Sequence, residues 1–120
     1  MAYALVVVGA SLGGMRALQT VLEGLPAAFA APVVVVQHCG PGHDSVRRAQ
    51  LREFSTLPVV TAEDKMELLP GHVYVAPADY HLLVDAGSLA LSTDAPVGHS
   101  RPSIDVLFES AALAFGGSRD

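Results

Sequence analysis

The sequence predicts a single α/β domain, residues 1–120, with a mostly parallel sheet and a small antiparallel β insertion. Two continuous runs of apolar, largely β-branched residues, 3–8 and 33–36, are typical of parallel strands that are covered on both faces. Each run leads into a turn that contains glycine, and each turn leads into a segment that reads as a helix. This alternation of strand and helix indicates crossover connections between parallel strands.

The first half of the chain supplies both expected strand–helix units. After the first strand, residues 13–22 place Met15, Leu18 and Leu22 three and four positions apart, which predicts a helix with one apolar face. After the second strand, residues 45–54 predict another helix, with Ser45 as its N-cap.

The second half begins with short strands rather than with further strand–helix units. Tight turns separate these strands, which predicts an antiparallel insertion. The expected strands are 57–61, 73–76, 81–84 and 89–91.

A last helix is predicted at Ile104–Phe115. Ser103 is the expected N-cap, and Asp105 lies in the first turn, where a helix dipole favours negative charge. Glycines follow directly and end the helix.

Composition excludes several classes of protein. The net charge is −5 with only seven Lys and Arg residues, and they form no basic cluster, so binding to a nucleic-acid backbone is not expected. The single Cys39 cannot form an internal disulfide, as is usual in a reducing compartment. The N-terminus has no basic region, and no apolar run reaches the length of a membrane span. We therefore expect a cytoplasmic protein without membrane insertion.

The densest local motif is GASLGG at residues 9–14, between a strand and a helix. A dinucleotide fingerprint would need glycine where Ser11 stands and an acid near the end of the second strand, where Gln37 and His38 stand. The same motif fits the nucleophile elbow G-x-S-x-G, in which glycines allow a sharp turn that exposes the serine hydroxyl. A role for Ser11 as a simple helix cap is the alternative.

The position of His38 favours the interpretation of this motif as a nucleophile elbow. It follows the second strand directly, so it belongs to the same carboxyl edge of the sheet as Ser11. Binding sites of open parallel sheets form at that edge, and adjacent strands lie about 5 Å apart. There an imidazole can accept the hydroxyl proton of a serine.

Four stretches of the sequence resemble the catalytic domain of the chemotaxis protein-glutamate methylesterases, the CheB type. They are VVVGASLGG, PVVVVQHCGPG, LLPGHVYVAPADYHLL and RPSIDVLFESAA, in family order and across nearly the whole chain. The resemblance implies a doubly wound α/β domain that hydrolyses glutamyl methyl esters on chemoreceptor signalling helices and releases methanol. Methylated receptor helices are therefore the expected partner.

By position, the resemblance implies that Ser11 is the nucleophile and His38 its general base. Backbone N–H groups of Leu12 and Gly13 are the candidates for part of the oxyanion hole. This chemistry needs no metal ion and no organic cofactor.

Two further polar residues, His81 and Arg101, fall in matching stretches and are candidates for supporting the site or contacting substrate. For His81 a structural or surface role is favoured, and for Arg101 a role at the entry of the last helix is equally plausible. Cys39, His38 and His43 follow no zinc-ligand spacing, so Cys39 is expected to fill space as a small apolar residue.

The resemblance also indicates what this chain lacks. The family's orienting acid lies beyond the last helix, so the triad and the C-terminal side of the sheet are expected to be incomplete, and no receiver domain is expected. Asp120 follows a helix without the strand and turn that would deliver it to His38. Loss of the orienting acid lowers turnover of serine triads by about 10⁴-fold, so weak or absent activity is expected.

Two further expectations follow. A non-catalytic module that binds receptor helices is the alternative function. The first strand reads as central because it is apolar throughout, and in a doubly wound sheet a strand after the last helix would pair beside it. Without that strand its edge is expected to stay open and to favour self-association.

Overall fold

The computed structural model describes residues 5–10, 15–26, 30–37, 44–77, 80–85, 87–93 and 102–115. In chain order its elements are β1 (Val6–Ala10), α1 (Met15–Glu23), β2 (Val33–Gln37), α2 (Asp44–Phe54), β3 (Val59–Thr61), β4 (Val73–Val75), β5 (His81–Asp85), β6 (Ser88–Ser92) and α3 (Ile104–Phe115). Within these residues, β1, β2, β4 and β3 form one sheet in that order, and β5 and β6 form a separate pair. No helix among them is long and apolar enough to cross a membrane.

The sheet is parallel throughout its described part. β2 pairs with β1 on one side and with β4 on the other, and β3 pairs with the far side of β4. The four valines of β2 are completely buried, as expected for a strand covered on both faces. They alternate between the two cores: Val33 and Val35 face one, and Val34 and Val36 face the other.

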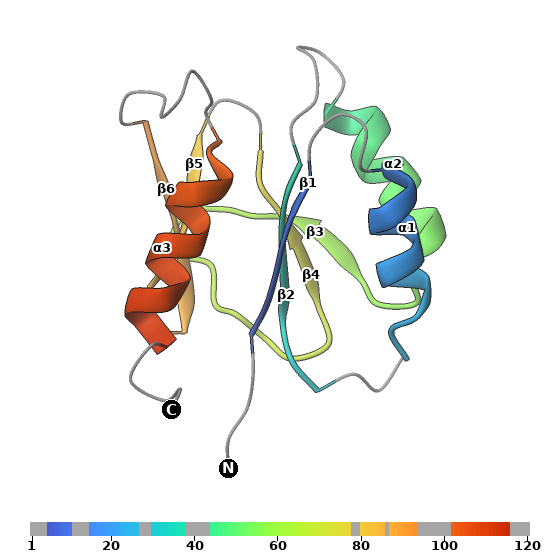
Figure 1. Ribbon diagram of the computed structural model, residues 1–120, viewed down its shortest axis with the longest axis horizontal. Helices are drawn as coiled ribbons and strands as arrows, with labels where there is room; N and C mark the ends of the chain where they lie inside the picture. Colours follow the sequence, from blue (N-terminus) through green and yellow to red (C-terminus); the bar gives the residue numbers. More distant parts are fainter. Residues whose placement is uncertain are drawn as a thin grey trace.

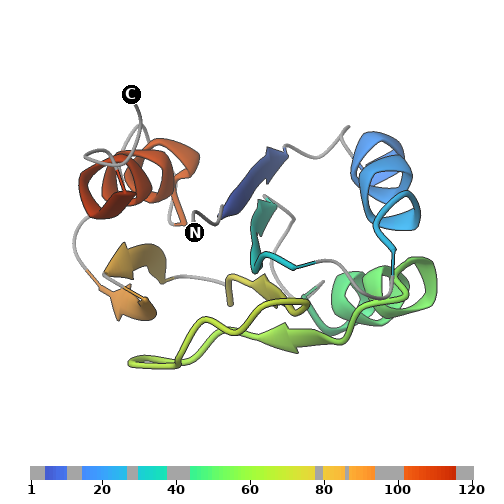
Figure 2. The same cartoon turned by 90° about the horizontal axis from the view of Figure 1, so that it is seen from below.

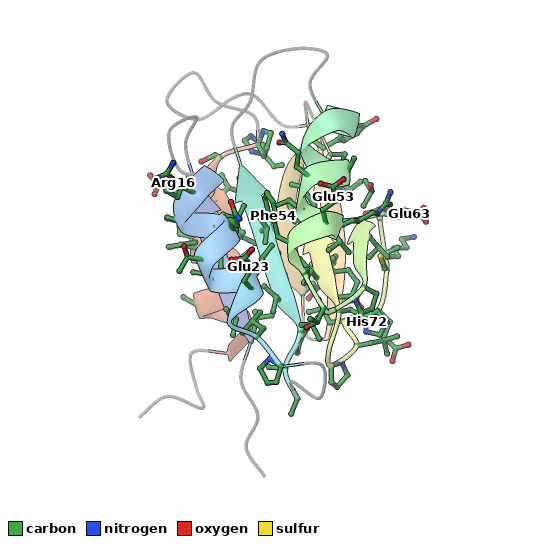
Figure 3. The ribbon with its side chains drawn as sticks, turned by 90° about the vertical axis from the view of Figure 1, so that its right-hand side faces the viewer. Arg16, Glu23, Glu53, Phe54, Glu63 and His72 are labelled. Carbon is green, nitrogen blue, oxygen red and sulfur yellow. The ribbon has the colours of Figure 1, made fainter. Side chains whose placement is uncertain are left out.

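Each face of the sheet has its own cover (Figure 2). Helices α1 and α2 lie on one face, where Leu18, Leu22 and Leu51 pack against the valines. Figure 3 looks onto these two helices. Helix α3 and the β5–β6 hairpin cover the other face, where Leu82 and Leu107 join the second core. The result is the expected doubly wound arrangement with a small antiparallel piece.

The expected extent of the antiparallel insertion is wrong for β3 and β4. Both belong to the parallel sheet, and among the described strands only β5 and β6 pair antiparallel. The connection 62–72 between β3 and β4 contains no helix. For this reason the two strands look like parts of antiparallel hairpins in the sequence. Its backbone instead bonds to β6: the Lys65 N–H donates to the Leu89 carbonyl, and the Leu89 N–H donates to the Met66 carbonyl. Long-range pairing with β6 thus replaces the usual crossover helix.

Local boundaries differ from expectation by a few residues. The described first strand begins at Val6, and α1 begins at Met15. Helix α2 begins at Asp44 and already includes Ser45, so the prediction of Ser45 as N-cap is wrong. Helix α3 has exactly the predicted bounds.

The first strand is the outermost strand of the described sheet. Val6, Val7 and Val8 are half-buried, whereas their partners in β2 are fully buried. The apolar character of β1 arises because both of its faces are covered, by α1 on one side and by α3 on the other.

Candidate active site

The carboxyl ends of β1 and β2 form the centre of the candidate site. Ala10 and Gln37, the last residues of the two strands, are direct register partners. Ser11 and His38 are the next residues in the sequence after these two partners. Adjacent strands lie about 4.8 Å apart. The sheet therefore brings together the two residues that directly precede the predicted nucleophile and base in the sequence.

Several predicted residues lie outside the described part of the chain. They are Ser11, Leu12, Gly13, His38, Cys39, His43, Arg101 and Asp120. Their predicted roles, including the oxyanion-hole role of Leu12 and Gly13, stay predictions.

Gly9 is explained by packing against α3. A Cβ atom at this position would lie 2.5 Å from Cγ2 of Ile104, closer than real Cβ atoms approach their neighbours, and 3.0 Å from Cγ1 of the same residue. The sequence motif suggested that Gly9 serves a sharp turn. The structure adds that Gly9 admits the first residue of α3 to the end of β1. The sequence did not indicate the contact between Ile104 and Gly9, because the two residues are 95 positions apart (104 − 9).

The start of α3 is held by two polar contacts. Ser103 caps the helix as predicted, since its Oγ accepts the Val106 N–H at 3.3 Å. The Ser103 N–H in turn donates to Nδ1 of His81 at 3.2 Å. His81 is 2% exposed and Ser103 is 4% exposed, so this contact is shielded from water.

The contact indicates the tautomer of the neutral His81 ring. An imidazole nitrogen that accepts a hydrogen bond carries no proton, so the neutral ring has its proton on Nε2. His81 thus accepts a hydrogen bond from the residue that caps α3. Contact of His81 with substrate stays a prediction, as does the role of Arg101, which precedes the buried Pro102.

A second polar contact fixes the middle of α3 to β5. The Ser110 Oγ accepts the Val84 N–H at 2.9 Å and donates to the Leu107 carbonyl at 2.8 Å. The backbone of β5 is therefore bonded to β6 on one edge and to a serine of α3 on the other. α3 and its cap residue are therefore bonded to β5 at two points, and the same helix contacts β1.

His72 lies away from the candidate site. Its carbonyl accepts the Val33 N–H at the amino end of β2, and its Nδ1 lies 2.9 Å from the Pro70 carbonyl oxygen. Figure 3 shows His72 at the opposite end of the sheet from Arg16, which belongs to the first turn of α1. Figure 1 shows the same polarity, with β1 and β2 running toward the end of the molecule where α3 begins.

Comparisons with known proteins agree with this architecture. A family model described as CheB methylesterase matches residues 6–119. The catalytic domain of Thermotoga maritima CheB methylesterase, known from its crystal structure, superposes with a TM-score of 0.87 and 38% sequence identity, covering 94% of this chain and 62% of that one.

Curated relatives show the same similarity in sequence. A Leptospira interrogans protein with the provisional name protein-glutamate methylesterase/protein-glutamine glutaminase is 42% identical over 116 residues, which are 96% of this chain and 60% of that protein. Protein-glutamate methylesterase/protein-glutamine glutaminase 3 of Anaeromyxobacter dehalogenans is 49% identical over 113 residues, which are 92% of this chain and 33% of that protein. The chain thus spans only part of the length of these relatives.

Proposed function

This chain belongs to the CheB methylesterase family, and from that premise we propose that it hydrolyses methyl esters of glutamate side chains in chemotaxis receptors. Ser11 acts as the nucleophile and His38 as the general base. The observation that carries this assignment is the register pair Ala10–Gln37, because the two residues precede Ser11 and His38 directly.

The reaction is an acyl transfer through the serine. The Ser11 Oγ attacks the ester carbonyl while His38 takes the hydroxyl proton. His38 then gives this proton to the departing methoxy group, which leaves as methanol. Water, deprotonated by His38, hydrolyses the acyl-enzyme to free glutamate and serine. No step in this sequence uses a metal ion or organic cofactor.

The developing oxyanion needs donors near the nucleophile. We assign this role to the backbone N–H groups of Leu12 and Gly13, which precede α1 in the sequence. Loss of one such donor costs about 10²–10³-fold in turnover in serine hydrolases.

The names of the relatives pair ester hydrolysis with deamidation of protein glutamine. Both reactions proceed by attack on the same carbonyl carbon, and they differ in the leaving group, methanol or ammonia. We therefore include glutamine side chains of receptor helices as a second substrate class.

The decisive experiment measures methanol released from a radiomethyl-labelled receptor fragment. Ser11→Ala removes the nucleophile, and Ser88→Ala, on the exposed β5–β6 turn, is the matched control. Release that depends on Ser11 and is kept by the control is the expected result. The same assay measures how fast the 120-residue chain alone hydrolyses the ester, which we expect to be slow.

Equal release from wild type and Ser11→Ala would contradict the proposal. Binding of the chain to a methylated receptor fragment would then test the alternative, a non-catalytic receptor-binding module of the same family.

A further inference from the structure

We propose that His81 is a positioning residue for the reaction: through Ser103 it holds the first turn of α3 against Gly9, and so sets the end of β1 from which Ser11 follows. This inference rests on the proposed function, because it assigns the reacting serine to that turn. It adds a specific role to a buried titratable side chain that the mechanism itself does not use.

The first link is the hydrogen bond between His81 and Ser103. The N-cap residue of a helix uses its side chain to accept an N–H of the first turn, as Ser103 does with Val106. The N–H of the cap residue itself needs a different acceptor, and here the acceptor is Nδ1 of His81, at 3.2 Å. Since Ser103 is buried, a lost acceptor would leave this N–H without compensation from water.

The second link is the contact between Ile104 and Gly9. Ile104 directly follows Ser103, and its side chain occupies the space that a Cβ of residue 9 would fill. Close-packed contacts of this kind transmit displacement, because neither partner can move toward the other. Ile104 moves with the first turn of α3, because it is the first residue of that helix. A shift of this turn toward β1 therefore displaces the end of β1.

The third link is the distance in sequence from Gly9 to the reacting serine. Ser11 is two residues after Gly9, and Ala10 between them is still paired with Gln37 in the sheet. A misplacement of about 1 Å at a reacting group can cost about 10²-fold in rate. A histidine on β5 can thereby influence turnover without touching the substrate.

Two polar substitutions test this role. The side-chain oxygen of asparagine can occupy the place of the imidazole Nδ1, so His81→Asn retains an acceptor for the Ser103 N–H. His81→Gln places its amide further out, near the position of Nε2, and loses that acceptor. Both variants put an amide into the same buried place, so they are matched in polarity.

We expect His81→Asn to keep kcat within about threefold of wild type and His81→Gln to lower it by about tenfold or more, with KM nearly unchanged in both. The reason is that a positioning fault affects the reacting geometry rather than substrate binding. Equal kcat for the two variants, or a change confined to KM, would overturn the proposal.

A second measurement does not depend on turnover. Amide NMR spectra of the same chains should show the Ser103 and Gly9 signals displaced together in His81→Gln and close to wild type in His81→Asn. Imidazole ¹⁵N shifts of the wild type should show the tautomer that has its proton on Nε2. A protonated Nδ1, or a Gly9 amide that stays in place when the Ser103 amide moves, would contradict the inference.

The two measurements separate the inference from the proposed function. A chain without Ser11-dependent turnover but with coupled Ser103 and Gly9 signals would sink the hydrolase assignment and with it the role of His81 in the reaction. Uncoupled signals with normal turnover would sink the positioning role alone.

Discussion

Ile104 occupies the space in which a side chain at Gly9 would lie, with its Cγ2 atom 2.5 Å from the position of a Cβ on that glycine. This contact joins the first residue of α3 to the penultimate residue of β1. It explains why the strand that leads to the predicted nucleophile carries glycine instead of another valine. It also makes the start of α3 part of the framework of the candidate site.

Gly9→Ala should destabilise the fold by about 1–3 kcal/mol, because a methyl group would be forced against Ile104. Urea unfolding would measure the change. Gly24→Ala is the matched control, since its added Cβ would lie at an ordinary 3.5 Å from the nearest atom. The double variant Gly9→Ala, Ile104→Ala should be less destabilised than the sum of its two single variants. Strict additivity would show that the clash is not the cause.

Ser110→Ala should lower the free energy of unfolding by about 1–3 kcal/mol, since the Val84 N–H would lose its acceptor in a buried place. Thermal or urea unfolding would measure this change in the free energy of unfolding. Ser88→Ala removes a hydroxyl that bonds the Asp85 carbonyl on the exposed turn, and it should change stability by less than about 0.5 kcal/mol. Similar losses for both variants would argue against the anchoring role of Ser110.

Tyr74→Phe should destabilise the connection 62–72. The Tyr74 hydroxyl accepts the Leu69 N–H at 2.8 Å and donates to the Glu67 carbonyl at 3.0 Å, and its side chain is buried. Loss of both bonds should cost about 1–3 kcal/mol. Tyr80→Phe is the control because that ring is exposed. Amide exchange should become faster at Leu69 in the first variant only; unchanged exchange there would contradict the prediction.

Ser11→Ala and His38→Ala should each reduce methanol release to the same low level, and the double variant should fall no further. Residues that act as one catalytic unit lose nearly the whole effect when either is removed, by a factor on the order of 10⁶ in subtilisin. Single-turnover release from labelled receptor fragment would measure it. Losses that multiply in the double variant would mean that the two side chains act independently.

The outer edge of β1 should make the 120-residue chain self-associate. β1 is the outermost strand of the described sheet and consists largely of valine, and such edges pair readily with another chain. Sedimentation velocity over a range of concentrations should show a species larger than a monomer that dissociates on dilution. A well-folded monomer at roughly tens of micromolar would contradict this expectation.

Local patterns in the sequence were sufficient for much of the fold. The valine run of β2 predicts a strand buried on both faces, and the structure confirms it. The bounds of α3 and its cap at Ser103 were also predictable, because capping chemistry and helical spacing act within a few residues. The register of β1 with β2 agrees with the expectation that their carboxyl ends lie together.

Other features depend on contacts between distant parts of the chain. The sequence alone suggested an antiparallel role for β3 and β4, because short strands between turns look alike whichever neighbour they pair with. Only the folded chain selects that neighbour.

The same holds for the support of the candidate site. The sequence by itself predicted Ser11 and His38 as a pair, from the turn and the strand end in which they lie. It favoured a structural role for His81 without naming a partner, and it included Ile104 only as the first residue of a predicted helix. The tertiary structure supplied the contacts of both residues, since their partners, Ser103 and Gly9, come from other parts of the chain. Hydrogen bonding and close packing act through space, so a pattern read along the chain contains no information about which distant residue will meet them.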